Sequence, residues 1–140
     1  MSDRSYNTNL ASEFYVLSAL HRLGLDAVLT LGNKKSVDLA VVRDAGDSVT
    51  VDVKGLAGKT SWPVDNVKGV KPQHFLVFVC YCGKIEEVEI SPEVWVIPST
   101  KLARFIYHAP GGRKVVPRSK LLQEEAQEYR NAWSLIAGKS

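Results

Sequence analysis

The chain has 140 residues, of which 45% are hydrophobic and 24% charged, and its formal net charge is +3. These values are ordinary for a globular protein, so they exclude a disordered chain and favour one domain spanning residues 1–140. The longest apolar runs are shorter than the roughly 20 residues of a membrane helix, and the first residues lack the apolar segment of a secretory signal. We therefore expect a cytoplasmic protein that stays away from membranes, with a weak basic excess that permits nucleic-acid binding.

The first predicted element is a helix from about Asn9 to Leu23, which Thr8 could cap and Gly24 could end. Its apolar side chains recur at helical spacing on one face: Leu10, Val16, Leu17, Leu20 and Leu23. Such a face has to pack against another element, and the segments that follow indicate a sheet.

Strand-like segments follow the helix in close succession. They are residues 27–31, 37–43, 48–54, 74–82, 86–90 and 94–97. The second and third are joined by a short Asp-Ala-Gly-Asp turn that predicts a hairpin, and residues 55–72 between the third and fourth read as a loop. A short helix to about Tyr107 and a longer one from Pro117 to about Ile136 complete an α/β pattern.

Polar residues stand where the strand pattern expects apolar ones. In residues 49–54 the alternation places three valines on one face and Thr50, Asp52 and Lys54 on the other. Asp38 interrupts the apolar strand before it, and a buried carboxylate needs a partner. Asp38 and Asp52 share a face only if opposed residue numbers add up to an even value, which predicts an odd hairpin loop or a bulge, with Gly46 in the left-handed region.

These residues have two simple structural explanations, namely an Asp38–Lys54 ion pair and a solvated polar face. Glu13 favours a functional site instead, because helical geometry places it among the apolar residues that face the sheet. Three carboxylates that converge repel one another unless a cation joins them, and oxygen ligands suit Mg²⁺ or Mn²⁺. A metal here would activate water and polarise a phosphoryl group, while Lys54 offsets charge in the transition state.

The pattern of Glu13, Val37-Asp38 and Asp52-Val53-Lys54-Gly55 resembles the PD-(D/E)XK nuclease superfamily, and the helical glutamate resembles archaeal Holliday-junction resolvases in particular. The resemblance implies a restriction-endonuclease-like fold, with a central mixed sheet flanked by an N-terminal helix and two C-terminal helices. It implies that Asp38, Asp52 and the Val53 carbonyl ligate the metal. Glu13 would be a direct or water-mediated ligand and Lys54 the catalytic lysine. Val37 replaces the family's proline, and Asp52 replaces its commoner glutamate.

Other residues have weaker claims to a role. Gln73 resembles a polar position near the metal in relatives, and the alternative is an amide at a strand edge. Trp62 could stack on a base or anchor its loop in the domain. The histidines, at positions 21, 74 and 108, share no ligand spacing and are expected to be surface or satisfied histidines. Cys80 and Cys82 are expected to be reduced thiols near the core, without a second pair to complete a metal site. Several loop lysines could contact phosphates or simply be solvated: Lys34, Lys35, Lys59, Lys68 and Lys71.

The function these features favour is metal-dependent hydrolysis of phosphodiester bonds in DNA, with Mg²⁺ or Mn²⁺ as the cofactor. A double-stranded or branched DNA substrate would require two active sites, and hence a homodimer. The first alternative is a catalytically inactive nuclease-fold module that binds nucleic acid or a protein partner. A structural dimerisation domain with an incidental acidic cluster is the third reading.

Overall fold

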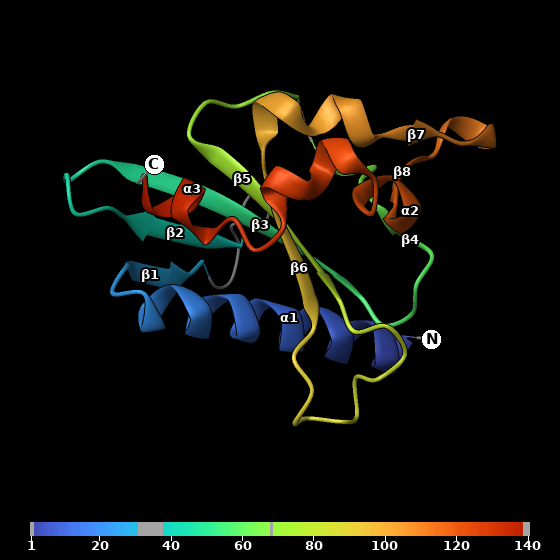
Figure 1. Ribbon diagram of the computed structural model, residues 1–140, viewed down its shortest axis with the longest axis horizontal. Helices are drawn as coiled ribbons and strands as arrows, with labels where there is room; N and C mark the ends of the chain where they lie inside the picture. Colours follow the sequence, from blue (N-terminus) through green and yellow to red (C-terminus); the bar gives the residue numbers. More distant parts are fainter. Residues whose placement is uncertain (1, 31–37, 68, 139–140) are drawn as a thin grey trace.

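The computed structural model describes residues 2–30, 38–67 and 69–138, so the predictions for Lys34, Lys35, Val37 and Lys68 lie outside the described residues. A five-stranded sheet forms the centre, in the order β1-β2-β3-β5-β6 (Figure 1). Its strands are β1 (Asp26–Leu29), β2 (Leu39–Val42), β3 (Ser48–Leu56), β5 (His74–Cys80) and β6 (Glu93–Pro98). The sheet is mixed, because β3 and β5 run parallel whereas the other neighbouring strands are antiparallel.

Helices and a second, smaller sheet surround this centre. The helical segments are α1 (Ser2–Arg22), η1 (Ser99–Phe105), η2 (Pro110–Gly112), α2 (Arg118–Leu121), η3 (Glu124–Tyr129) and α3 (Trp133–Ala137). The smaller sheet has the order β4-β8-β7, with β4 at Ser61–Pro63, β8 at Lys114–Pro117 and β7 at Tyr107–His108. The α/β class and the flanking helices agree with the prediction from the sequence.

The two faces of the central sheet belong to two different apolar cores. The valines of β3 at positions 49, 51 and 53 pack with Val16 and Leu20 of α1. The opposite face, where Leu76 and Phe78 of β5 lie, packs against Trp62 of β4 and residues of η1, α2 and η3. Because side chains alternate along a strand, Asp52 and Lys54 project to the side opposite α1.

Helix α1 is longer than predicted and presents a different stripe to the sheet. It begins at Ser2, so Thr8 is an interior residue and does not cap it. Its buried stripe consists of Thr8, Ser12, Val16 and Leu20, at intervals of four residues. At its C-terminus, Gly24 adopts a φ of +83° and its N–H donates to the His21 carbonyl, while Leu25 N–H donates to Leu20. These two hydrogen bonds form a Schellman motif, which ends the helix at the predicted glycine.

A close approach between α1 and β3 fixes where the helix crosses the sheet. A Cβ atom added to Gly55 would overlap the Ser12 hydroxyl and come 3.1 Å from the Thr8 carbonyl oxygen. Only glycine therefore lets the helix lie this close to the strand. The contact places the neighbouring residue of α1, Glu13, beside the end of β3.

The hairpin between β2 and β3 has the predicted register. Leu39 lies opposite Val51 and Val42 opposite Ser48, so opposed numbers add up to an even value. Arg43 N–H donates to Asp47 O, which leaves the three residues 44–46 as the loop, and Gly46 has a φ of +94°. An odd loop with a left-handed glycine is a common hairpin connection.

Three predictions about other segments were wrong. Residues 86–90 form turns, and β4 lies within the stretch predicted to be loop. The single helix expected after Pro117 is divided into α2, η3 and α3, and Asn131 between the last two has a φ of +52°. Among the described residues, no helix is long and apolar enough to cross a membrane.

Candidate active site

The site lies next to Asp38, directly before the first residue of β2. The backbone N–H of Asp38 donates to Val51 O at 3.0 Å, although Val51 is also the register partner of Leu39. Asp38 and Leu39, the first residue of β2, thus both face Val51 of β3, as in a β-bulge. The Asp38 carboxylate then accepts a hydrogen bond from Val53 N–H at 2.7 Å, so it occupies the position that the next residue of a regular ladder would fill.

The same edge of β3 offers a backbone carbonyl. In a strand, the N–H and C=O of one residue point to the same side. Because Val53 N–H points toward Asp38, the Val53 carbonyl also points away from β5, to the side of β3 on which Asp38 lies. This is the oxygen that the family resemblance implies as a metal ligand.

Polar residues of α1 line the opposite wall. Ser5, Asn9 and Glu13 follow one another at intervals of four and form a stripe next to the buried one. Glu13 is half-buried and lies at the margin of the sheet-facing surface, whereas the sequence predicted it in the middle. The regular spacing of these three residues was a signal in the sequence that could have shown Ser5 and Asn9 as part of the site.

Lys54 faces the cleft from β3, and the loop after β4 contacts its ammonium group. Lys54 Nζ donates to the Asn66 Oδ1 atom at 2.8 Å. The neighbouring Asp65 is held in turn by Arg113 Nε at 2.9 Å and by Lys114 N–H at 2.7 Å, and these hydrogen bonds lower the pKa of its carboxyl group. Among the described residues, Asp38 and Lys54 do not form a salt bridge, which counts against the simple ion-pair interpretation.

These residues enclose a cleft of about 420 Å³. Its lining includes Glu13, Asp38, Val53 and Lys54, four of the six predicted site residues. Burial raises the pKa of Glu13, and the charge of Asp38 raises it further. Burial also raises the pKa of Asp38, as does the charge of Asp52, while the Val53 N–H and the charges of Lys54 and His74 oppose the rise. The acids are thus held where their charges are unfavourable without a cation.

Asp52 lies next to this group, but its carboxylate is turned toward His74. His74 Nε2 is 3.3 Å from Asp52 Oδ2, and His74 Nδ1 is 2.6 Å from the Thr50 hydroxyl. His74 is 3% exposed, and both of its ring nitrogens have partners. The sequence suggested a surface or satisfied histidine and missed its contact with Asp52, because that contact depends on the parallel pairing of Thr50 with His74.

The structure gives the remaining candidates positions that do not support a role in the site. Gln73 is exposed, has a φ of +55°, and its carbonyl accepts from Thr50 N–H near the start of β3. Trp62 contributes to the lining, yet it is fully buried, donates from Nε1 to Val79 O and packs edge-on against Phe78. Its role as an anchor in the core is therefore confirmed. Lys59 and Lys71 are not among the lining residues.

A comparison with solved structures finds a nuclease with a similar fold. The structure resembles that of the bacterial homing endonuclease I-Ssp6803I, with a TM-score of 0.59 and 18% sequence identity. The similarity covers 94% of this chain and 89% of the endonuclease chain. No family model matches the sequence, and no curated protein matches it. The protein therefore shares its mixed α/β fold, over nearly its whole length, with a homing endonuclease.

Proposed function

We propose that the protein is a nuclease of the PD-(D/E)XK type that hydrolyses phosphodiester bonds in DNA with Mg²⁺ or Mn²⁺. The observation that carries the proposal is the meeting of Glu13, Asp38, Val53 and Lys54 in one cleft, from α1, β3 and the residue that precedes β2. A fold shared with a homing endonuclease supports the same class of chemistry. Cleavage of both strands of DNA would require two copies of the site, so we also propose a homodimer, acting in the cytoplasm where DNA is accessible.

The donor atoms of the cleft fit a hard divalent cation. Glu13 and Asp38 offer carboxylate oxygens, and the Val53 carbonyl points to the side of β3 on which Asp38 lies. Asp52 is close enough for its charge to raise the pKa of Asp38. Mg²⁺ and Mn²⁺ prefer such oxygen ligands. When bound, the cation would neutralise phosphate charge and make water a better nucleophile. The raised pKa values of both acids indicate a site whose charge a cation would relieve.

Lys54 supplies positive charge that the acids do not. Its ammonium group reaches the cleft and donates to Asn66, so it is held by the loop and remains available to a phosphate or an attacking water. In the reaction, it would stabilise the charge that develops on the phosphoryl oxygens. Asp38 keeps its position through Val53 N–H, and the packing of α1 on Gly55 places Glu13.

The test is incubation of the purified protein with plasmid, branched DNA and single-stranded DNA in Mg²⁺, in Mn²⁺ and in EDTA. We expect cleavage that requires the metal and that Asp38→Asn and Lys54→Met abolish. Lys101→Met, an exposed lysine of η1, is the matched control. Binding of DNA without cleavage under all conditions would contradict the proposal and favour an inactive module.

One observation favours that alternative module. The Asp52 carboxylate is hydrogen-bonded to His74, and Asp52 is not among the residues that line the cleft. If this contact is retained when a metal is present, Asp52 contributes no ligand and the affinity for the metal is low. Calorimetric titration with Mn²⁺ separates the two cases, because the inactive module should bind the ion weakly.

A further inference from the structure

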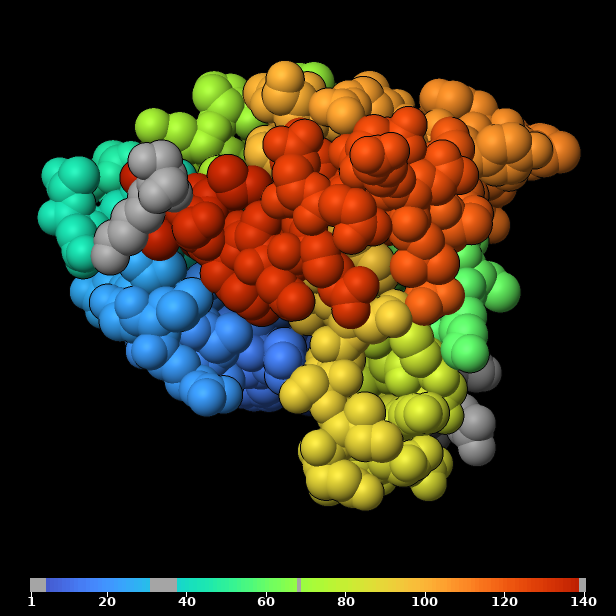
Figure 2. Space-filling model, viewed as in Figure 1, coloured from blue at the N-terminus to red at the C-terminus, as the bar shows by residue number. Residues whose placement is uncertain are grey.

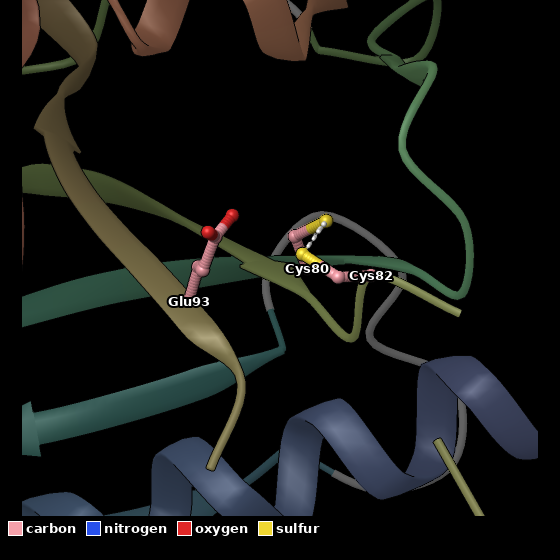
Figure 3. A group of neighbouring side chains, drawn as sticks. All are labelled: Cys80, Cys82 and Glu93. Carbon is pink, nitrogen blue, oxygen red and sulfur yellow. Dashed lines mark hydrogen bonds between the residues drawn. The ribbon is translucent and has the colours of Figure 1, made fainter. Parts of the chain in front are cut away.

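A second group of potential metal ligands lies at the C-terminal end of β5, outside the cleft around Asp38. Cys80 ends β5 and is the register partner of Glu93, which begins β6. Cys82 follows in the turn with a φ of +55°. One ligand atom from each of these three residues lies within 4.8 Å of the others, and Figure 3 shows the Cys80 and Cys82 sulfurs beside the Glu93 carboxylate. Their proximity was missed in the sequence because it depends on the pairing of β5 with β6.

The two thiols are in hydrogen-bond contact and form no disulfide. Cys80 and Cys82 are free cysteines, with their Sγ atoms 3.4 Å apart. Cys80 is fully buried and its thiol donates to Gly58 O at 3.0 Å, whereas Cys82 is half-buried. Two sulfurs bound to one zinc ion in tetrahedral geometry lie about 3.8 Å apart, given Zn–S bonds of about 2.3 Å. A shift of about 0.4 Å would therefore suffice for both to bind.

Arg118 holds the third group in place. Its Nε and Nη2 atoms donate to the two oxygens of Glu93 at 2.9 and 3.0 Å. Each carboxylate oxygen has a second lone pair, so this pairing leaves Glu93 able to bind a metal. Ligating carboxylates are themselves usually fixed by a hydrogen bond of this kind.

We propose that Cys80, Cys82 and Glu93 form a site for Zn²⁺. Binding releases two thiol protons, so two thiolates, one carboxylate and the cation carry a net charge of −1, which the guanidinium of Arg118 balances. The three residues also line a cavity of about 280 Å³, together with Lys59, Tyr81 and Ser91, which would leave space for a fourth ligand. A site with three protein ligands and an open position differs from a closed structural zinc site and leaves room for water or a small anion.

The site would fasten the base of a projecting segment. Residues 81–92 connect β5 to β6 and extend from the body of the molecule as the yellow lobe of Figure 2. Cys80 and Cys82 lie where the segment leaves the body, and Glu93 lies where it returns. A metal bound to all three closes this loop, which reduces the freedom of the unfolded chain and of the lobe.

The site is independent of the proposed nuclease centre. The cleft around Asp38 and the cavity around Cys82 share no lining residue. Their donors also differ, because thiolates select softer ions such as Zn²⁺ whereas the cleft offers oxygen to Mg²⁺. Failure of one proposal therefore leaves the other standing.

The experiment uses Co²⁺ as a spectroscopic substitute for Zn²⁺, with the reduced full-length protein. We expect one equivalent of Co²⁺ to give the thiolate-to-metal charge-transfer band and the strong visible bands of a tetrahedral site, and one equivalent of Zn²⁺ to remove them. Cys82→Ser should lose the charge-transfer intensity in large part, and Glu93→Gln should weaken binding more than about tenfold. Glu89→Gln, an exposed acid of the same lobe, is the matched control.

Melting curves show whether the variants are folded, and Zn²⁺ should raise the melting temperature of the parent but not of Cys82→Ser. Asp38→Asn should leave the Co²⁺ spectrum unchanged. The proposal is overturned by the absence of a charge-transfer band, by unchanged affinity in folded Cys82→Ser, or by loss of Co²⁺ binding in Asp38→Asn. Rapid oxidation of Cys80 and Cys82 to a disulfide in the presence of Zn²⁺ would also overturn it, since bound thiolates resist oxidation.

Discussion

The carboxylate of Asp38 accepts a hydrogen bond from Val53 N–H at 2.7 Å, just beyond the Leu39–Val51 pair with which the described pairing of β2 and β3 ends. This contact satisfies a backbone donor and at the same time fixes a charged group at the mouth of the cleft. Asparagine at this position could still accept the hydrogen bond through its Oδ1 atom, so the structural and chemical roles of Asp38 can be separated.

Asp38→Asn should therefore fold and lose function. We expect its melting temperature without metal to equal or exceed that of the parent, because a carboxylate that burial and Asp52 disfavour has been removed. Divalent-ion binding and DNA cleavage should both be lost. Asp38→Ala, which leaves Val53 N–H without this acceptor, should cost about 1–3 kcal/mol of stability. Melting curves of the two variants provide the comparison, and equal losses in both would argue against the hydrogen bond.

Lys54→Met is expected to reduce cleavage by at least about 100-fold, since the ammonium group acts on charge in the transition state. Its loss should change the free energy of unfolding by less than about 1 kcal/mol, because its hydrogen bond to Asn66 is exposed. Calorimetric Mn²⁺ affinity should be retained. A large loss of stability together with retained cleavage would mean that Lys54 is structural.

The pH dependence of stability should report the acids of the cleft. Glu13 and Asp38 both have a folded-state pKa above the ordinary values of 4.5 and 3.8. Between the ordinary and raised values, the folded protein binds more protons than the unfolded chain, so stability without metal falls as the pH rises through this interval. The loss is complete above the raised pKa values.

Glu13→Gln should remove its part of this pH dependence. At neutral pH the variant should be at least as stable as the parent without metal and gain less stability from Mg²⁺. Melting temperatures across pH, with and without Mg²⁺, provide the measurement. A variant that is less stable without metal, but gains as much from it as the parent, would exclude Glu13 from the site.

His74 is expected to orient Asp52. An ionised carboxylate can only accept, so His74 Nε2 carries the hydrogen toward Asp52, and in the neutral imidazole Nδ1 accepts from the Thr50 hydroxyl. His74→Phe should weaken Mn²⁺ binding about tenfold if Asp52 is a ligand. Thr50→Val, which keeps the imidazole, should have a smaller effect. Unchanged Mn²⁺ affinity in both variants, with lower melting temperatures, would limit the pair to folding.

Gly55→Ala should destabilise the protein, although alanine suits a strand at least as well as glycine does. The added Cβ overlaps the Ser12 hydroxyl and forces α1 away from β3, at a cost of about 1–3 kcal/mol. Since Glu13 follows Ser12, metal binding should also weaken. Gly58→Ala is the matched control, because a Cβ there meets no atom within 4 Å. Equal stability of the two variants, measured by denaturant unfolding, would rule out the close approach as a constraint.

The parts of the site predicted from the sequence depend on local geometry. The alternation that separates Asp52 and Lys54 from the valines of β3 follows from the two-residue period of a strand. The hairpin brings Asp38 next to β3 because its loop is short and Gly46 accepts the left-handed conformation. Neither inference requires knowledge of distant parts of the chain.

The parts that could not be predicted depend on pairing between distant segments. His74 reaches Asp52 only because β5 pairs in parallel with β3, and Asn66 reaches Lys54 from a loop after a three-residue strand. That strand, β4, pairs with β8 more than 50 residues later, so its own sequence predicts a loop. In the C-terminal region, the helical spacing of apolar residues continues past Asn131, but this residue has a positive φ and separates η3 from α3.

The three-residue tip of the β2–β3 hairpin has a consequence for how this chain can change over evolution. The tip, residues 44–46, lies outside the paired residues and at the far end of both strands from the cleft. Deletion of one tip residue would leave a two-residue loop between Arg43 and Asp47, so Leu39 could still lie opposite Val51 and Asp38 could still reach Val53 N–H. Deletion of one residue within the paired part of β3 would instead turn the residues beyond it to the other face of the sheet. Homologous sequences should therefore vary in length at this tip while the distance from the first paired residue of β3 to Lys54 stays constant.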